Sequence, residues 1–200
     1  MTREAMLDHV RMALGRKPGA PPEPPPPVYL PVIETSLEQR IAQFTTALEE
    51  LAGRVIRCTS RDAARDAASS MIAGRRAVLS GAPYLRLCGI AADGNADREK
   101  ADIGVTSADY ALADTGTLVM ISGAGESRLV SLLPPAHIAV VPVSRLLANL
   151  DDLLIRLPHP ADTTSSMVLI TGPSRTADIE QILVRGVHGP GDITVILVDE

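Results

Sequence analysis

From Ser36 onward, short apolar runs alternate with segments that have the spacing of amphipathic helices. Helical spacing occurs at 37–51, 61–72 and 143–156, and strand-like apolar runs occur at 55–58, 77–79, 103–106, 118–121, 167–170 and 193–198, with further strand or strand-flank material at 129–133 and 137–141. Apolar strands separated by helices are typical of a mostly parallel sheet covered on both faces. We therefore predict a three-layer α/β domain over residues 36–200.

Composition narrows the classes of function. The chain is 46% hydrophobic but only 2% aromatic, so its core must consist of aliphatic side chains. Its net charge of -5 argues against non-specific nucleic-acid binding, which needs a positive face. No apolar run approaches the ~20 residues of a membrane span, and the N-terminus lacks a long apolar leader. We expect a cytoplasmic protein.

The N-terminal region has its own pattern. Residues 1–17 predict an amphipathic helix with Met6, Val10 and Leu14 on one face. Residues 18–35 predict a proline-rich linker, which is a stiff spacer or a ligand for proline-binding modules. Because an isolated helix of this length is marginal in water, we expect it to pack on its own domain, on a second copy in a homo-oligomer, or on a partner protein.

The cysteine count bears on redox chemistry. Cys58 and Cys88 are the only two cysteines, and they form no CxxC pair. An iron–sulfur cluster usually needs four cysteine ligands, so we expect no cluster in this chain and two buried, inert thiols. The sequence also lacks the GxGxxG and P-loop fingerprints, so we predict no cofactor bound by this chain alone.

The C-terminal part contains a predicted strand–turn–helix unit. The strand at 167–170 is followed by a turn at Gly172 and by a helix that Ser174 and Thr176 can cap. Free N–H groups at a helix start attract anions, and Arg175 adds a positively charged fork. We predict that these four residues after the strand bind a carboxylate or phosphate.

Acidic neighbours offer an alternative for this segment. Asp178 and Glu180 can neutralise Arg175 instead of leaving it for a ligand. His188 follows and is a weak candidate for proton transfer. A metal site made from His188 and the two acids lacks a ligand spacing such as HxxxH, so we predict no metal site.

A second candidate segment, residues 114–117, precedes the strand at 118–121. Gly116 can bring a backbone N–H close to a ligand, Thr115 and Thr117 offer hydroxyl groups, and Asp114 is a weak catalytic candidate. The alternative is a simple turn or bulge at the strand entry. We expect this segment, the glycine loop at 123–128 and the segment after residue 170 to converge at the carboxyl edge of the sheet. His137, at the start of an apolar strand, is more typical of a structural residue than of a base.

Three blocks together resemble a known family. They are Ala111–Met120 (ALADTGTLVM), Ser131–Val140 (SLLPPAHIAV), and Gly172–Glu180 (GPSRTADIE) with Gly186–Pro190 (GVHGP) behind it. Their sequence and order resemble the LUD-domain family, the family of lactate-utilization protein C, across residues 109–198. The resemblance implies the topology of coenzyme A transferases and sugar-phosphate isomerases (NagB/RpiA-like). The family usually has Glu where this chain has Asp114, so its acid is one methylene shorter here.

The resemblance also implies a function. Members act in growth on L-lactate through its conversion to pyruvate, and companion proteins carry the iron–sulfur clusters. For this chain we expect a ligand-binding or accessory subunit that has iron–sulfur proteins as partners and takes a small anionic ligand. The alternatives are a free-standing enzyme of the transferase or isomerase type and a pure interaction module.

Overall fold

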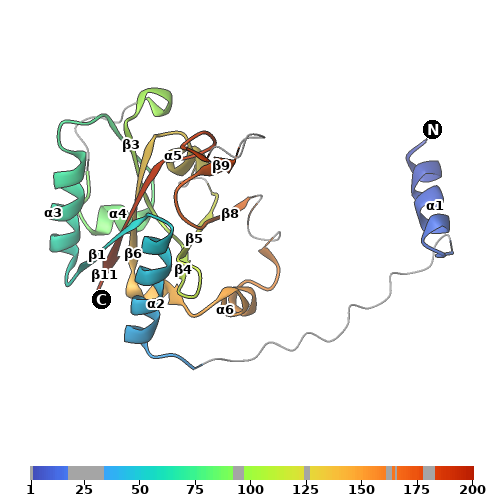
Figure 1. The fold of residues 1–200 in the computed structure, drawn as a ribbon, viewed down its shortest axis with the longest axis horizontal. Coiled ribbons are helices and arrows are strands. Elements are labelled where there is room, and N and C mark those ends of the chain that lie inside the picture. Colours follow the sequence, from blue (N-terminus) through green and yellow to red (C-terminus); the bar gives the residue numbers. More distant parts are fainter. Residues whose placement is uncertain are drawn as a thin grey trace. The chain divides into compact units, whose positions relative to one another are not determined.

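The computed structural model describes residues 2–17, 34–91, 97–123, 127–160, 164, 166–177 and 183–200 (Figure 1). The chain divides into two units, residues 1–31 and residues 32–200. Within the described ranges, no helix has both the length and the apolar character needed to cross a membrane.

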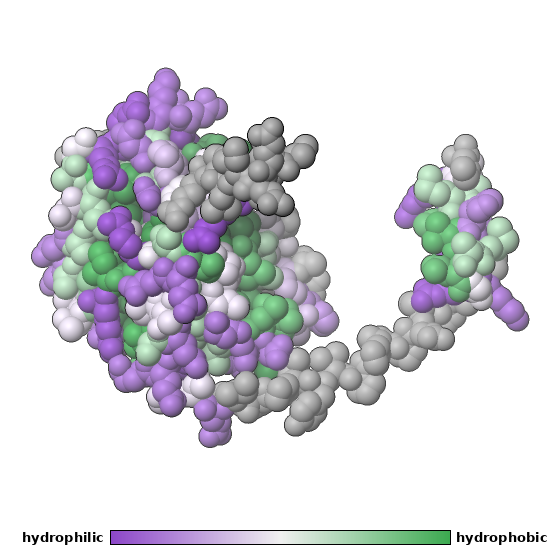
Figure 2. All heavy atoms as spheres, viewed as in Figure 1, coloured by the Kyte–Doolittle hydropathy of each residue, from purple (hydrophilic) through white to green (hydrophobic). Residues whose placement is uncertain are grey.

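The N-terminal unit contains the helix α1 (Arg3–Ala13), which lies within residues 1–17, where the sequence predicts a helix. Thr2 caps it, since its hydroxyl accepts a hydrogen bond from the Ala5 N–H at 3.3 Å. None of its side chains is buried, and Figure 2 shows hydrophobic side chains on its surface between charged ones. Met6 and Val10 are each more than half exposed. Residues 18–33 of the predicted linker lie outside the described residues, and only Glu34 and Thr35 are described.

A five-stranded parallel sheet forms the centre of the second unit. Its strands are, in spatial order, β1 (Arg54–Cys58), β11 (Asp192–Val198), β6 (Ala136–Pro142), β3 (Ile103–Ser107) and β2 (Ala77–Leu79). The strand predictions at 55–58, 77–79, 103–106 and 193–198 are confirmed. The apolar run that starts at His137 is also a strand of this sheet.

Apolar layers cover both faces of the parallel sheet, as predicted. Helices α3 (Arg61–Ile72) and α4 (Pro83–Leu87) pack on one face, and α2 (Leu37–Glu50) packs on the other. Alternate residues of β11 divide between the faces: Ile196 and Val198 meet α3, whereas Val195 and Leu197 lie in the cluster with α2. In Figure 1, α3 lies on one side of the parallel strands, and α6 with the remaining strands lies on the other.

A second sheet replaces part of the single sheet that we predicted. It has the order β7 (Leu146–Leu147), β4 (Tyr110–Leu112), β5 (Thr117–Ile121) and β8 (Met167–Ile170), and β5 runs antiparallel to both of its neighbours. Side chains of β5 such as Leu118 and Met120 join the core cluster under α2. The strands at 118–121 and 167–170 are therefore confirmed, but they do not belong to the parallel sheet.

The predicted helix over 143–156 is wrong in its first half. Residues Val143–Arg145 form a 3₁₀ turn (η2), and the following strand β7 pairs with β4. Asn149 then caps a shorter helix, α6 (Leu150–Arg156), by accepting a hydrogen bond from the Asp152 N–H at 3.0 Å. Leu146 and Leu147 have helical spacing, but they form a strand that pairs with β4. Spacing alone does not distinguish a helix from a strand in so short an apolar run.

The run at 129–133 is also corrected, because it belongs to a short helix, α5 (Arg128–Leu132). This helix packs directly on β3 at Gly104, where an added Cβ would lie 1.9 Å from the Val130 carbonyl oxygen. A short 3₁₀ turn, η1 (Arg98–Lys100), precedes β3. The close approach of helix and strand requires glycine at position 104.

The predicted helix after Thr176 is not formed in the described residues. Instead, β9 (Arg175–Ala177) pairs antiparallel with β10 (Leu183–Arg185). The Ser174 N–H donates to the Pro190 carbonyl at 2.8 Å, and the Ser174 carbonyl accepts from the Gly186 N–H at 3.0 Å. These strand-like contacts take the place of helix capping by Ser174.

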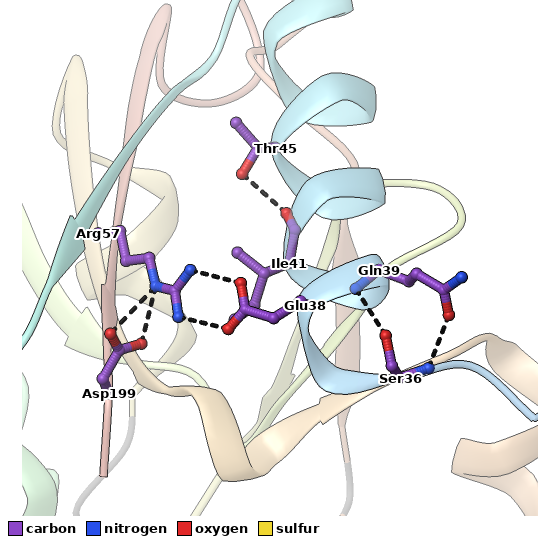
Figure 3. Close-up of polar contacts among 7 residues, drawn as sticks. All are labelled: Ser36, Glu38, Gln39, Ile41, Thr45, Arg57 and Asp199. Carbon is purple, nitrogen blue, oxygen red and sulfur yellow. Dashed lines mark hydrogen bonds and ion pairs between the residues drawn. The ribbon is translucent and has the colours of Figure 1, made fainter.

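Polar contacts fix the start of α2 against the sheet (Figure 3). Ser36 and Gln39 form a reciprocal capping box, with distances of 3.2 and 2.9 Å between side-chain and backbone atoms. Arg57 on β1 bonds Glu38 through both terminal nitrogens, at 2.8 and 2.7 Å, and bonds Asp199 through Nε at 2.9 Å. These ion pairs connect the beginning of α2 with the ends of β1 and β11.

We expect Arg57→Gln to lower the thermal midpoint modestly, because the pairs are exposed but form a bidentate network. The loss should shrink at about 1 M salt, where surface charges are screened. Arg54→Gln is the matched control, since the exposed Arg54 side chain forms no polar contact with a described residue. Equal midpoints for the two variants at low salt would show that the network adds no stability.

Candidate functional site

The carboxyl ends of the parallel strands are the usual ligand position in an open α/β sheet. In this chain, Ala108 and Asp109 follow β3, and the η2 turn follows β6 directly. Because β3 and β6 are neighbours in the sheet, these two segments meet at one edge. Helix α4, which follows β2, brings Tyr84 to the same edge.

Arg145, the last residue of η2, is held in place from two sides. Its Nη1 donates to the Ala108 carbonyl at 3.0 Å and lies 3.4 Å from the Ser107 hydroxyl. Its guanidinium carbon lies 5.4 Å from the centre of the Tyr84 ring, in a cation–π contact. Nε and Nη2 donate to no described residue, so this half-buried guanidinium keeps a positive fork for an anion.

Asp109 is a half-buried acid beside this cation. Its Oδ2 accepts a hydrogen bond from the Ile121 N–H, at the end of β5, at 2.7 Å. Burial raises the pKa of Asp109 above its ordinary value, and the bond from Ile121 and the charge of Arg145 oppose that rise. A carboxyl with a raised pKa next to a fixed cation is typical of functional sites.

Tyr84 contributes a buried hydroxyl to the same edge. The residue is 6% exposed, and its hydroxyl oxygen has no hydrogen-bond partner among the described residues. Burial raises the pKa of Tyr84 above its usual range, and the nearby Glu200 carboxylate raises it further.

Arg145, Asp109 and Tyr84 are not among the site residues predicted from the sequence. The signal that marks the first two is their position, because each comes within three residues of the end of a parallel strand. We assigned residues 143–156 to one helix, which placed Arg145 inside an element instead of at a strand end. Tyr84 lies in the short helix α4, which no predicted element covers.

The predicted segment 114–117 forms the turn between β4 and β5. Thr115 Oγ1 donates to Asp114 at 3.2 Å and lies 2.8 Å from Thr117 Oγ1, which lies 2.8 Å from Thr171 Oγ1. Gly116 has a φ of +64°, and an added Cβ would lie 2.6 Å from the Leu48 nitrogen in α2. The turn is thus packed against α2, and its hydroxyl groups bond one another.

Gly172 and Arg175 both contact Leu51, at the C-terminal end of α2. An added Cβ on Gly172 would lie 3.0 Å from the Leu51 Cβ, and Arg175 Nη2 donates to the Leu51 carbonyl. The last carbonyl groups of a helix have no hydrogen-bond donor within the helix, so an arginine that bonds one of them satisfies it. Its positive charge also interacts favourably with the helix dipole and stabilises the helix. In this structure Arg175 therefore contacts the protein itself.

Ser174 and His188 lie beside this cluster, while Thr176 lies in β9 opposite Val184. The Ser174 hydroxyl lies 3.4 Å from the His188 N–H, and the His188 side chain is exposed. The loop at 186–191 leads into β11, and the Gly191 N–H donates to the Pro135 carbonyl just before β6. These residues lie at the amino ends of the parallel strands, so the prediction that this segment reaches the carboxyl edge is wrong. Asp178 and Glu180 lie outside the described residues.

Asp114 also lines a shallow open hollow of about 500 Å³ along α2, with Ala42, Gln43, Thr46, Ala47 and Glu50. Arg175 and His188 are not among its lining residues. The structure thus brings the turn, Gly172 and Arg175 to one end of α2, but it does not bring Asp114, Arg175 and His188 around this hollow.

Both cysteines are buried thiols that form no disulfide bond. Burial raises the pKa of Cys58 and of Cys88, which lowers their reactivity at neutral pH. In the described part of the chain, no three His, Cys, Asp or Glu side chains are grouped so that they could hold a metal ion.

Comparison with known proteins gives consistent matches. The LUD domain family matches residues 95–198, just over half of the chain. Lactate utilization protein C from Halalkalibacterium halodurans is 45% identical over 106 residues, which are 51% of this chain and 46% of that protein. The proteins of the same name from Macrococcus caseolyticus and Bacillus subtilis are 41% and 40% identical over 106 residues, and the match covers 51% of this chain and 46% and 44% of those proteins.

These matches span about half the length of the curated relatives. A solved structure of a DUF162 family protein from Deinococcus radiodurans superposes with a TM-score of 0.64 at 18% identity. The superposition covers 82% of this chain and 99% of the Deinococcus radiodurans chain, which supports the α/β fold.

Proposed function

Because the chain belongs to the LUD-domain family, we propose that it is a component of an L-lactate utilization system, which oxidises lactate to pyruvate. The support for lactate comes from the name that the curated relatives share, lactate utilization protein C. The family match over residues 95–198 includes β3, the turn before β5, β6, and Asp109 and Arg145 of the carboxyl edge.

Its role in this proposal is that of a ligand-binding or accessory subunit without a redox cofactor of its own. Iron–sulfur proteins act as its partners and carry the electrons. The two cysteines of the chain support this division of labour, since they are buried and isolated, whereas a cluster needs several thiolate ligands.

The observation that carries the ligand-binding role is the guanidinium of Arg145 at the carboxyl edge. It is oriented by Tyr84 and by the Ala108 carbonyl, and Nε and Nη2 donate to none of the residues that the structure describes. A planar guanidinium with two free donors suits a carboxylate, which is the charged group of lactate and pyruvate. We place the small anionic ligand there.

We expect Arg145→Gln to weaken binding of L-lactate to the 200-residue chain by about tenfold or more, because a charge-assisted bond is lost. Isothermal titration calorimetry measures this directly. Arg54→Gln, on an exposed side chain at the amino edge, is the matched control and should bind like the unaltered chain.

The residues predicted from sequence define the competing location: Thr115, Gly116, Thr117, Gly172, Ser174, Arg175 and Thr176. Arg175→Gln tests it in the same titration. If Arg175→Gln abolishes binding and Arg145→Gln leaves it unchanged, the ligand sits at the end of α2. If the unaltered chain binds no small carboxylate, the ligand-binding role is wrong.

A second candidate function is a free-standing enzyme of the transferase or isomerase type. In this reading, the chain has the NagB/RpiA-like topology of coenzyme A transferases and sugar-phosphate isomerases. The specific support is Asp109, an acid whose raised pKa suits proton transfer. Turnover of a coenzyme A thioester or a sugar phosphate by the purified chain would favour this function, whereas lactate oxidation only with iron–sulfur partners favours the first.

A further inference from the structure

The outer face of the second sheet is only partly covered by its helix. Helix α6 has 7 residues, and it packs on this face through Leu153, which is buried in one cluster with Val119 of β5. Leu169 of β8 lies opposite Val119, so its side chain is on the same face of the sheet. Leu169 is nevertheless 45% exposed, so α6 leaves this edge of the face open.

Helix α6 adds apolar side chains of its own to the open region. Leu150, Leu154 and Ile155 are 42%, 40% and 56% exposed. Figure 2 shows hydrophobic residues gathered on the surface where α6 lies in Figure 1. We call these three residues and Leu169 the α6 surface. Single exposed apolar side chains are ordinary, but several of them gathered on one face mark an interaction site.

Strand β8 supports the same interpretation. It is an end strand, because β5 is its only neighbour in the described sheet. End strands are usually protected from pairing with other chains by a charge, a proline or a bulge. The sequence of β8, MVLI, contains neither a charge nor a proline. An uncharged end strand beside an exposed apolar helix is typical of a face that is covered in an assembly.

The charges of α6 indicate what covers this face. Asp151 and Asp152 lie in the first turn of the helix and Arg156 lies in the last. No ion pair joins Asp151 or Arg156 to a described residue. Two copies of α6 packed antiparallel bring the acidic start of each helix to the basic end of the other, whereas parallel packing opposes like charges. The helix is therefore complementary to a second copy of itself that is related by a two-fold axis.

We propose that the α6 surface is a homodimer interface, in which α6 of one copy packs antiparallel on α6 of a second copy about a two-fold axis. Leu154 and Ile155 are buried between the two helices, and Asp151 pairs with Arg156 of the partner subunit. The proposal is independent of the ligand site. Because four side chains make a small interface, the dimer is weak and depends on protein concentration.

Sedimentation velocity of the 200-residue chain, over concentrations from the micromolar to the millimolar range, tests this interface. We expect a reversible monomer–dimer equilibrium. Ile155→Glu should raise the dimer dissociation constant by about tenfold or more, because each copy then places a carboxylate in the apolar contact. Leu87→Glu is the matched control, since Leu87 is 58% exposed on α4, and it should dimerise like the unaltered chain.

Charge reversal tests the antiparallel arrangement. Asp151→Lys alone and Arg156→Glu alone should each weaken the dimer about threefold or more, because like charges then meet at two symmetric positions. The double variant restores opposite charges at both positions, so its dimer should regain the affinity of the unaltered chain. Circular dichroism confirms that each variant is folded, and the charge variants decide the case if Ile155→Glu does not fold.

Three results would overturn the proposal. A chain that stays monomeric over the whole series would exclude a second copy and leave the α6 surface to a different protein. Loss of the dimer in Leu87→Glu, or in Val10→Glu on α1, with Ile155→Glu unchanged, would place the contact on another surface. A double charge variant as weak as the two single variants would contradict the antiparallel pairing.

Discussion

Gly104→Ala is expected to lower the free energy of unfolding by about 3 kcal/mol, the upper part of the range for overpacked cores. The new Cβ would lie 1.9 Å from the Val130 carbonyl oxygen, and 3.2 Å from the Pro134 side chain. Because the nearer atom belongs to the backbone, a rotamer change cannot relieve the clash, and α5 must move away from β3. Urea denaturation followed by circular dichroism measures the loss.

Gly123→Ala is the matched control for this substitution. An added Cβ on Gly123 meets no atom within 4 Å, and neither Gly123 nor Gly104 has a positive φ. Both variants therefore gain the same small benefit from a less flexible unfolded chain. Unfolding free energies within about 0.5 kcal/mol of each other would contradict the tight packing of α5 on β3.

His137 should make the folded state lose stability in acid. The side chain is 1% exposed, its Nε2 lies 2.8 Å from the Thr106 hydroxyl, and its Nδ1 has no partner among the described residues. Burial lowers the pKa of His137 from its ordinary 6.5 to about 4. Below pH 6.5 the unfolded chain takes up a proton that the folded chain refuses, so stability falls as the pH decreases from 6.5 towards 4.

The full size of this contribution is about 3 kcal/mol, since a tenfold change in proton affinity corresponds to about 1.4 kcal/mol. Urea unfolding of the unaltered chain and of His137→Gln across this pH range isolates it. Asp109, whose pKa is raised, acts in the opposite direction, but it is common to both proteins and cancels in the difference. The variant should show a flatter dependence on pH.

A His137→Gln curve parallel to that of the unaltered chain would contradict the assignment. If the variant does not fold, NMR titration of the His137 ring protons in the unaltered chain answers the same question. Titration near pH 6.5 would show that the ring is solvated, whereas a buried ring titrates well below 6.5.

Local pattern was sufficient for the parallel layer and its helices. Three predictions coincide with observed elements: the apolar runs at 55–58 and 193–198, and the helical spacing at 61–72. In each of them, the apolar side chains have the spacing of the element that forms, and they are buried in a shared core. The α/β class follows from their alternation.

Strand pairing explains two elements that the pattern did not predict. Leu146 and Leu147 have helical spacing, but they extend the second sheet beside β4, a strand that lies far away in the sequence and outside any local window. Arg175–Ala177 has capping residues in front of a helix-like run, but it pairs antiparallel with the nearby segment Leu183–Arg185. In that second case a helix and a strand pair compete for the same local residues, and residue spacing did not decide between them.

The candidate site, too, was only partly predictable from the sequence. Residues 114–117, Gly172 and Arg175 do come together, as predicted, but it is the end of α2 that gathers them, through Leu48 and Leu51. The carboxyl edge could be identified only after β6 and β3 were known to be neighbours, since that pairing brings Arg145 to Ser107 and Ala108 at the end of β3. Arg145 was hidden because the predicted helix began at residue 143, whereas α6 begins at Leu150.

An NMR titration of the ¹⁵N-labelled 200-residue chain with L-lactate tests the location of the ligand most directly. We expect the largest backbone amide shifts at Ser107, Ala108, Asp109 and Arg145, with a shift of the Tyr84 ring. Shifts confined to residues 114–117 and 172–175, with the carboxyl edge unchanged, would contradict the account.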